Sequence, residues 1–327
     1  MSFDQQKTAL NYDIAIVGGA IVGATLAAAL KNSGLRIIII EAKPLELVAA
    51  RTQAYALSLL SGEILEGIGV WQDIFPHVGK YRHISLSDGE SPLTVEFEQN
   101  DLSRDFLGYV GEHRVILTAL HKFTANCSNI TWLSPAKVEK IIYQDEQASL
   151  KISSQGKTYC LNAKLVVGAD GAKSAIRQTT AIKTRGWQYW QSCVAFTIKH
   201  EAASNDTAFE RFWHSGPMGI LPLPGNRCQV VWTAPHAEAQ KLLAMAEEKF
   251  LAKLTKRTGG KLGRLQLVNP RVLFPVRLMQ CDRYIKLRLA LIGDAAHCCH
   301  PVGGQGLNLG IRDAAVLAGV LQEAHNR

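Results

Sequence analysis

The sequence predicts an α/β protein in which a doubly wound parallel sheet carries an inserted, mainly antiparallel α+β part. Three observations lead to this prediction. The chain opens with a strand, a glycine turn and an alanine-rich helix; apolar strands ending in glycine and aspartate return at 165–171 and 287–294; and alternating strand patterns occur within 185–270. At 327 residues the chain exceeds the size at which one core usually stops growing, so two lobes are expected.

The parallel-sheet part begins with a strand, a helix closed by Gly34 and a second strand. This spacing with short turns is the opening unit of a doubly wound sheet. Its expected elements run in chain order as strand 12–17, helix 21–32, strand 36–41, a helical segment 51–71, helix 110–125, strands 130–143 and 148–159, and a buried parallel strand 164–167.

The inserted part begins as a hairpin-like pair of short strands at 82–97, where Asp88-Gly89 and Ser91-Pro92 supply turns. Its remaining expected elements are strands 193–198 and 229–232 and a lysine-rich helix 237–254. A strand at 287–292 and a helix at 307–321 then return to the first part.

Composition excludes several classes of protein. Lys and Arg outnumber Asp and Glu to give a net charge of +8, but the excess is dispersed, as in Lys256-Arg257, which does not favour nucleic-acid binding. Seven cysteines without a Cys-x-x-Cys pair argue against a disulfide framework or a zinc site and favour the cytoplasm. The apolar stretch 14–30 is short for a membrane span and is split by Gly18-Gly19, so neither a transmembrane segment nor a cleaved leader is expected.

The first chemical motif is the turn after the opening strand, Gly18-Gly19-Ala20-Ile21-Val22-Gly23. A tight glycine turn at a helix start lets backbone N–H groups face a pyrophosphate. Glu41, followed by Ala42, ends the second strand, where a carboxylate accepts hydrogen bonds from an adenosine ribose and favours a cofactor without a 2′-phosphate. Ala20 replaces the middle glycine of G-x-G-x-x-G, and the competing interpretation is a small-residue helix packed closely on a strand.

The second motif, Gly168 to Arg177, follows the apolar strand 165–167. Asp170-Gly171 predicts a turn at the carboxyl end of this strand, and Ser174 and Arg177 are expected on the first turns of the next helix. Ligands of open α/β sheets bind at such strand ends. The competing interpretation is an Asp-Gly turn with a capping serine and no ligand.

The third motif begins with Gly293-Asp294, again after an expected strand, and continues through the glycine-rich loop 301–306 into a helix. Backbone N–H groups at such a helix start stabilise a negatively charged ring or phosphate. His297 and His300 are two potential metal ligands, but no third ligand accompanies them, so no metal is expected.

In this order, the three motifs resemble those of the flavin-dependent aromatic hydroxylases, the class A flavoprotein monooxygenases, over most of the chain. Gly18 to Gly23 is similar to their adenosine-diphosphate motif, Asp170-Gly171 to the motif shared by flavin and nicotinamide nucleotide, and Gly293-Asp294 to the flavin ribityl motif. Within this superfamily, the strings 293–313 and 59–71 are most similar to the ubiquinone-biosynthesis hydroxylase branch.

This resemblance implies a Rossmann-like FAD-binding domain made of residues 1–80, 101–184 and 271–327. It assigns 81–100 and 185–270 to an inserted α+β substrate domain. It also implies that a C-terminal helical region is missing, because relatives usually continue beyond the position at which this chain ends.

The resemblance also assigns residues to the site. Arg51 stands near the place of a family arginine that reaches the flavin, although Gln53 lies nearer, and His113 or Arg114 would supply a polar group beside the ring. His300 and Pro301 are assigned to the catalytic side of the flavin. The residues assigned to FAD are Gly18, Gly19, Ala20, Gly23, Glu41, Ala42, Arg51, Arg114, Asp170, Gly171, Arg177, Gly293, Asp294, Gly303, Gly304, Gln305, Gly306, Leu307 and Asn308.

The function implied by the resemblance is hydroxylation of an aromatic polyprenyl phenol or quinone precursor, with FAD as cofactor, NAD(P)H as reductant and O2 as oxidant, through a peroxyflavin. His297, His300 and Tyr189 are candidate bases for a phenol proton. The competing interpretation of Tyr189, with Trp187 and Trp190, is a core cluster of the second lobe. Peripheral membrane contact and quinone-biosynthesis protein partners are also expected, since a polyprenyl substrate resides in lipid. The alternatives are a flavin-dependent reductase of the same fold and a non-catalytic flavin-binding subunit.

Overall fold

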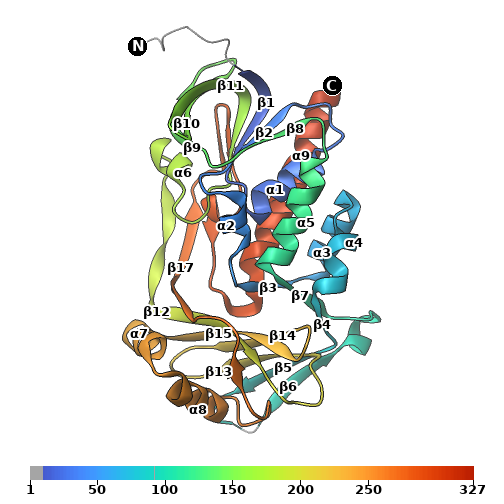
Figure 1. Cartoon of the computed structure of the whole chain (residues 1–327), viewed down its shortest axis with the longest axis vertical. Helices are drawn as coiled ribbons and strands as arrows, with labels where there is room; N and C mark the ends of the chain where they lie inside the picture. The colour runs from blue at the N-terminus through green and yellow to red at the C-terminus, as the bar shows by residue number, and fades with distance from the viewer. Residues whose placement is uncertain (1–9, 92) are drawn as a thin grey trace.

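The computed structural model describes residues 10–91 and 93–327. A parallel sheet with its helices forms one lobe, and a large antiparallel sheet with two helices forms the other (Figure 1). Two long strands, β12 and β17, run between the lobes, and the start of the last helix, α9, lies beside the second sheet (Figure 1). The predicted α/β class with parallel and antiparallel sheets is confirmed.

The first sheet has the strand order β18-β19-β11-β1-β2-β8, with β10 and β9 added in turn to β11. β19, β11, β1, β2 and β8 are mutually parallel, so their carboxyl ends lie at one edge of the sheet. Its strands are β1 (Leu10–Val17), β2 (Ile37–Ile40), β8 (Ile130–Leu133), β9 (Lys137–Tyr143), β10 (Ala148–Ser154), β11 (Lys157–Gly168), β18 (Ile285–Lys286) and β19 (Leu289–Leu291).

Alternation along the buried strands divides the core of this lobe. Ile14 and Ile16 pack with Leu26 of α1 and Ala314 of α9 on the helical face. Ala15 packs on the other face, against apolar residues of β9 and β10 and the short helix α6. The helices are α1 (Ile21–Ala29), α2 (Leu45–Ala49), α3 (Leu59–Ile68), α4 (Trp71–Ile74), α5 (His113–Ala125), α6 (Ala175–Thr179), α7 (His236–Ala244), α8 (Glu247–Arg257) and α9 (Gln305–Asn326), with 3-10 turns η1 (Phe75–His77), η2 (Gln99–Leu102), η3 (Gly293–Ala295) and η4 (Val302–Gly304).

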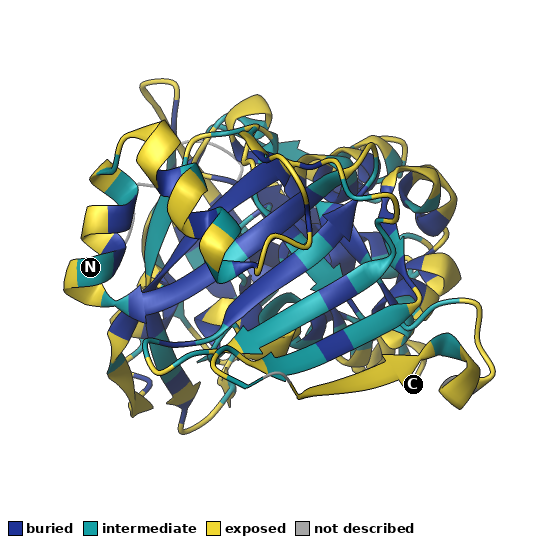
Figure 2. Cartoon of the chain, turned by 90° about the horizontal axis from the view of Figure 1, so that it is seen from below, coloured by how far each residue is buried: buried dark blue, intermediate teal, exposed yellow. Residues whose placement is uncertain are grey.

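The second sheet has the order β20-β17-β12-β15-β14-β13-β5-β6, and β16 also pairs with β12. Figure 2 shows this sheet from below, with buried central strands and an edge that becomes exposed, as along β6. Its strands are β5 (His83–Asp88), β6 (Thr94–Glu98), β12 (Thr184–Lys199), β13 (Thr207–Phe212), β14 (Met218–Leu223), β15 (Arg227–Pro235), β16 (Gln266–Leu267), β17 (Val272–Cys281) and β20 (His297–Cys298). A small third sheet joins β3 (Ala54–Leu57), β7 (Gly108–Glu112) and β4 (Gly79–Tyr81).

The two faces of the second sheet have different neighbours. Trp232 of β15 packs with Phe250 and Leu254 of α8, so one face is covered by helices. Gln229, on the opposite side of the same strand, accepts a hydrogen bond from the backbone N–H of Ala54 in the first lobe at 3.1 Å. We call this second side the inner face; by alternation and register it carries Cys193, Ala195, Thr197, Ala208, Glu210, Gly219, Leu221, Arg227, Gln229, Val231 and Thr233.

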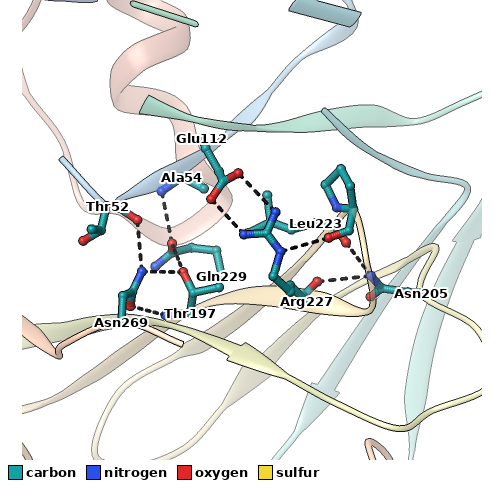
Figure 3. Close-up of polar contacts among 10 residues, drawn as sticks. Thr52, Ala54, Glu112, Thr197, Asn205, Leu223, Arg227, Gln229 and Asn269 are labelled. Atoms are coloured by element: carbon teal, nitrogen blue, oxygen red, sulfur yellow. Dashed lines mark hydrogen bonds and ion pairs between the residues drawn. The ribbon is translucent and has the colours of Figure 1, made fainter. Parts of the chain in front are cut away.

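Polar contacts fix the inner face to the first lobe (Figure 3). Arg227 makes two charge-assisted hydrogen bonds to Glu112 at 3.0 and 3.2 Å. The side-chain amide of Asn269 donates to the hydroxyl of Thr197 at 2.8 Å and to the carbonyl of Thr52 at 3.4 Å. Bidentate geometry adds direction as well as energy, so these contacts define how the two sheets face each other.

Several predicted elements need correction. Residues 51–71 are not one helical segment, because Ala54–Leu57 forms β3 and pairs with β7 before α3 begins. The start of the predicted helix 110–125 belongs to β7, and α5 begins at His113. The helix predicted over 237–254 is interrupted between α7 and α8, where Met245 and Ala246 are extended. In the first two segments, pairing between distant strands decided the structure.

The strand membership of residues 271–281 bears on the domain description. They were grouped with the FAD-binding part by resemblance, yet β17 pairs with β12 along the second sheet.

The apolar stretch 14–30 forms the end of β1 and all of α1. Over the described ranges, no helix has both the length and the apolar character needed to cross a membrane.

Candidate functional site

The three sequence motifs meet at one edge of the first sheet. They follow β1, β11 and β19, which are adjacent and parallel in the order β19-β11-β1. Backbone hydrogen bonds link the exits, since Ala169 N–H donates to Val17 O at 2.8 Å and Ile292 N–H donates to Gly168 O at 3.0 Å. Carboxyl ends of parallel strands are where open α/β sheets bind ligands.

The turn from β1 to α1 leaves no room for side chains at its glycines. Gly18 has a φ of +109°, and a Cβ there would lie 2.3 Å from the carbonyl oxygen of Ala169. A Cβ on Gly23 would lie 2.0 Å from the carbonyl oxygen of Gly18. Ala20 occupies the N-cap of α1 with an extended backbone, and its side chain makes no cap hydrogen bond. The backbone N–H groups at the start of this helix therefore remain suited to a phosphate.

Glu41 lies directly beside this turn, as its position at the end of β2 predicted. Its carboxylate accepts hydrogen bonds from Gly19 N–H at 2.8 Å and from Lys43 N–H at 3.0 Å. The residue is 9% exposed, and the following Ala42 is exposed. A nearly buried carboxylate that borders the phosphate-type turn is placed to bind hydroxyl groups of a nucleotide.

The second motif is held by Arg177 rather than open to a ligand at that residue. Ser174 caps α6 by accepting from Arg177 N–H at 3.0 Å. Arg177 is 7% exposed, and its guanidinium donates to Ala295 O at 2.8 Å and Ala172 O at 3.0 Å. Arg177 thus joins the loop after β11 to the loop after β19. Its contacts favour an indirect, positioning role over the direct cofactor contact implied by the resemblance.

Asp170 and Asp294 present carboxylates at the two neighbouring exits. One oxygen of Asp170 accepts from Ile176 N–H at 3.2 Å, while its Oδ1 is buried without a hydrogen-bond partner. Asp294 is an exposed residue, yet desolvation by the surrounding protein raises the pKa of its carboxyl. The charges of His297 and Arg277 oppose that rise. The accessible carboxylate of Asp294 and the unpartnered, buried Oδ1 of Asp170 both have acceptor capacity for a ligand that offers hydroxyl groups.

His297 holds the third motif to the last helix. Its Nε2 lies 2.6 Å from Asp313 Oδ2 in α9, and Gly293 N–H donates to the same oxygen at 2.8 Å. The hydrogen bond to Asp313 raises the pKa of His297 above its ordinary 6.5, outweighing desolvation. His297 is therefore committed to this ion pair and not to a metal; the described residues contain no group of three potential metal ligands.

This ion pair gives a pH-dependent contribution to stability. Because the folded-state pKa of His297 is raised, the contribution is complete below about pH 6.5 and is lost as the pH rises through the raised value. We expect His297→Gln to lower the free energy of unfolding by on the order of 1 kcal/mol below pH 6.5 and by less at alkaline pH. Urea unfolding at several pH values across this range measures the difference, and His77→Gln, at an exposed position, is the control. If the free energy of unfolding depends on pH equally in wild type and in His297→Gln, the ion pair makes no such contribution.

The glycine loop before α9 is open at Gly303 and Gly306, whereas Gly304 packs against Ala56 of β3. Gly303 and Gly304 have φ values of +69° and +63°, and a Cβ on Gly303 or Gly306 would meet no atom within 4 Å. Gln305 is exposed, and its amide donates to Gly303 O at 2.8 Å. The start of α9 therefore offers an unobstructed surface to a flat ring.

Asn308 and Leu307 support this loop from behind. Asn308 is 1% exposed; its carbonyl oxygen accepts from Ser58 N–H and from the Ser61 hydroxyl, and its amide donates to Ala56 O and Gly304 O. Leu307 packs against the core formed by α3, α4 and α5. All four Asn308 hydrogen bonds are internal, so its geometry favours fixing the glycine loop rather than contacting a ligand directly.

The residues expected near a flavin ring divide into two groups. Arg51 and Arg114 are exposed. His113 is 2% exposed, with Nδ1 at 3.1 Å from the Tyr55 hydroxyl, and burial together with the Arg51 charge lowers the pKa of His113 to about 4. His113 is thus a neutral, internal residue at neutral pH, whereas the two arginines remain accessible to a ligand.

The aromatic residues of β12 are not a core cluster. Trp187 and Trp190 are 57% and 62% exposed. Tyr189 lies edge-to-face against His300, with ring centroids 5.2 Å apart, and His300 Nδ1 accepts from Val302 N–H at 3.1 Å. The interpretation of Trp187 and Trp190 as core residues was wrong. Trp187 is exposed although it pairs with Leu278 of β17, and Trp190 lies in the bulge between Gln188 and Ser192.

Sequence reasoning missed Glu210 of β13 on the inner face. Desolvation raises the pKa of Glu210 to about 7, and the nearby backbone N–H of Gly303 opposes that rise. Its neighbours on the inner face are small, including Gly219, Ala195 and Cys193. No motif marks this residue; the available signal was an acid at an alternate position of Thr-Ala-Phe-Glu-Arg-Phe, a strand that reads as half-buried.

Comparisons with known proteins agree with this arrangement. A family model described as FAD binding domain matches residues 11–326. Uncharacterized protein slr1300 of Synechocystis is 51% identical over 97% of this chain and 76% of its own length. Ubiquinone hydroxylase UbiL of Rhodospirillum rubrum is 38% identical over 94% of this chain and 71% of its own, and 3-demethoxyubiquinol 3-hydroxylase of Escherichia coli is 34% identical over 96% and 80%.

A solved structure shares the fold. The p-nitrophenol 4-monooxygenase PnpA of Pseudomonas putida superposes with a TM-score of 0.82 at 20% identity, covering 97% of this chain and 81% of that one. At this identity the match concerns the backbone arrangement. The overall fold of this chain is therefore shared with that solved structure.

Proposed function

Because the chain belongs to the family of FAD-dependent monooxygenases, we propose that it hydroxylates the aromatic ring of a polyprenylated phenol or quinone precursor with NAD(P)H and O2. One observation carries the proposal: three loops suited to a dinucleotide leave adjacent strands and face a second sheet whose inner face includes the small residues Gly219, Ala195 and Cys193. A dinucleotide held at that edge would have its ring directed toward the inner face.

The residues present fit FAD. The turn Gly18 to Gly23 supplies N–H groups without side-chain obstruction, and Glu41 supplies acceptors for the adenosine ribose. Asp170 retains an unpartnered buried oxygen, and Asp294 presents an accessible carboxylate for ribityl hydroxyls. We propose that these residues hold FAD, with Arg51 and Arg114 as additional polar contacts.

The glycine loop and the inner face would enclose the ring. Gly303, Gly304 and Gly306 allow a flat ring to approach the backbone, where N–H groups at the start of α9 favour negative charge. Pro301 and His300 adjoin this loop on the substrate side. Bound FAD, reduced by NAD(P)H, supplies the activation of O2 and the transfer of one oxygen atom. The protein contributes orientation and exclusion of water.

The relatives' names support the proposed substrate class. One is named a ubiquinone hydroxylase and another a 3-demethoxyubiquinol 3-hydroxylase, and each aligns over more than nine-tenths of this chain. Such a substrate resides in lipid, so we propose peripheral contact with a membrane, which a net charge of +8 would favour on anionic lipid. Contact with other quinone-biosynthesis proteins is part of the same proposal.

Product analysis tests this function. The FAD-loaded protein is supplied with NADH or NADPH, 2-prenylphenol and ¹⁸O-labelled O2, and the ring product is identified by mass spectrometry. We expect a product that gains one labelled oxygen atom, with NAD(P)H oxidation stimulated by the phenol. NAD(P)H consumption with a reduced and unoxygenated product would instead support a flavin-dependent reductase. Absence of any phenol-stimulated oxidation would support a non-catalytic flavin-binding subunit.

A further inference from the structure

The direction of Glu210 is defined by the alternation of β13. Phe209 and Arg211 line a cavity of about 150 Å³ on the helix-covered face of the second sheet, together with Ser85 and Ser87 of β5. Ala208 packs instead in the cluster that includes Ala54 of the first lobe. Residues two apart on a strand share a face, so Glu210 points with Ala208 toward the first lobe.

The contacts of Glu210 bring it to the proposed flavin loop. The backbone N–H of Gly303, in the loop before α9, lies near enough to the Glu210 carboxylate to oppose the rise in its pKa. Gly219 is its register partner on β14, and a Cβ there would lie 3.1 Å from Glu210 Oε2. A carboxylate is therefore present between the glycine loop and a part of the sheet where side-chain volume is small.

Few charged groups face this carboxylate from the elements packed around it. Its partner on β5 is Leu86, and the ionisable residues of that strand, His83 and Asp88, lie at its two ends. β14 contributes no ionisable side chain. On β12, Cys193 is close enough for Glu210 to raise the pKa of its thiol. His300 precedes the glycine loop and contacts Tyr189.

The histidines available to accept a proton are less suited to do so. His297 is paired with Asp313 at 2.6 Å. His113 is buried against Tyr55, and its pKa of about 4 makes it a weak base. His300 accepts the backbone N–H of Val302, and burial lowers its pKa. Glu210 is the half-buried acid of the inner face that lies beside the flavin loop.

We propose that Glu210 is a catalytic residue that accepts the hydroxyl proton of the phenolic substrate. This assignment rests on the proposed function. In the step, the phenol O–H bond breaks, the proton passes to the Glu210 carboxylate to form a carboxylic acid, and the electron pair stays on the phenolate oxygen. The phenolate donates electron density to the ring and makes it a better nucleophile. A pKa of about 7 in the free protein is matched to this exchange near neutral pH.

The test compares wild type with Glu210→Gln, which keeps the shape and removes the base, and Glu210→Asp, which keeps the acid. Glu96→Gln on the exposed strand β6 is the matched control. With FAD, NAD(P)H and 2-prenylphenol, we expect the rate of ring hydroxylation to fall about 10²- to 10⁴-fold in Glu210→Gln. We expect the acidic limb of the wild-type pH profile near 7 to disappear, partial rescue by Glu210→Asp, and no change in Glu96→Gln.

Binding supplies a readout that does not depend on turnover. In protein labelled with ¹³C at the glutamate carboxyl carbons, a resonance absent from Glu210→Gln is expected to titrate near pH 7 and to shift when 2-prenylphenol binds. FAD affinity of Glu210→Gln, measured by flavin fluorescence, is expected within about threefold of wild type, less than 0.7 kcal/mol.

Each contrary outcome has a distinct meaning. If wild type hydroxylates the phenol and Glu210→Gln does so at a similar rate with the same pH profile, the assignment of Glu210 is overturned while the proposed function stands. If the carboxyl resonance does not respond to the phenol, direct contact is overturned. If FAD-loaded wild type hydroxylates no phenol, the proposed function fails and the role of Glu210 fails with it.

Discussion

Replacing Gly23 by alanine is expected to weaken FAD binding about 100-fold or more, equivalent to about 2.7 kcal/mol. The new Cβ would lie 2.0 Å from the carbonyl oxygen of Gly18, a backbone atom that cannot move without opening the turn from β1 to α1. Opening the turn separates the helix from the strand and disperses the N–H groups that would meet the pyrophosphate. Overpacking of this kind also costs on the order of 1–3 kcal/mol of folding free energy.

Flavin fluorescence titration and urea unfolding measure the two effects of Gly23→Ala. Gly67→Ala is the matched control, because Gly67 is an exposed residue of α3 and a Cβ there meets no atom within 4 Å. Alanine in that helix is expected to raise stability by up to about 1 kcal/mol and to leave FAD binding unchanged. Wild-type FAD affinity in a folded Gly23→Ala variant would show that this turn does not hold the cofactor.

Replacing Arg177 by methionine is expected to lower the free energy of unfolding by about 2–4 kcal/mol. Its guanidinium is almost buried and makes charge-assisted hydrogen bonds to Ala295 O and Ala172 O, which methionine cannot replace. Because these bonds join the loops after β11 and β19, FAD affinity is also expected to fall about tenfold through loss of preorganisation.

Arg185→Met is the control for Arg177→Met, since Arg185 is exposed on β12. Urea unfolding of both variants gives the stability change, and FAD titration of the folded fraction gives the affinity. If Arg177→Met loses no more stability and FAD affinity than Arg185→Met, the carbonyls of Ala295 and Ala172 find other partners and Arg177 does not organise the site.

The sequence indicated the part of the site that depends on local spacing. A glycine turn between β1 and α1, Glu41 at the end of β2 and the aspartates after two other apolar strands are recognisable because each depends on a few consecutive residues. Parallel pairing then places the ends of β1, β11 and β19 side by side. The meeting of the three motifs was therefore predictable from fold class together with motif order.

The remaining part depends on distant pairing that local patterns do not encode. Ala54–Leu57 became a strand because β7 pairs with it, and Trp190 became exposed where the pairing of β12 with β17 is irregular. The use of Asn308 and Arg177 as internal supports follows from carbonyls contributed by other segments. Glu210 reaches Gly303 only after the second sheet has packed on the first lobe.

The most direct test of this account is the flavin content of the purified protein. After FAD is added and excess is removed, the visible spectrum is recorded and the bound flavin is released by acid and identified by mass. The account predicts that the wild-type protein is yellow and retains FAD. Folded Gly23→Ala is expected to lose FAD, and Gly67→Ala is expected to retain it. A folded, colourless wild-type protein that takes up no FAD would contradict the assignment of the three strand exits as the cofactor site.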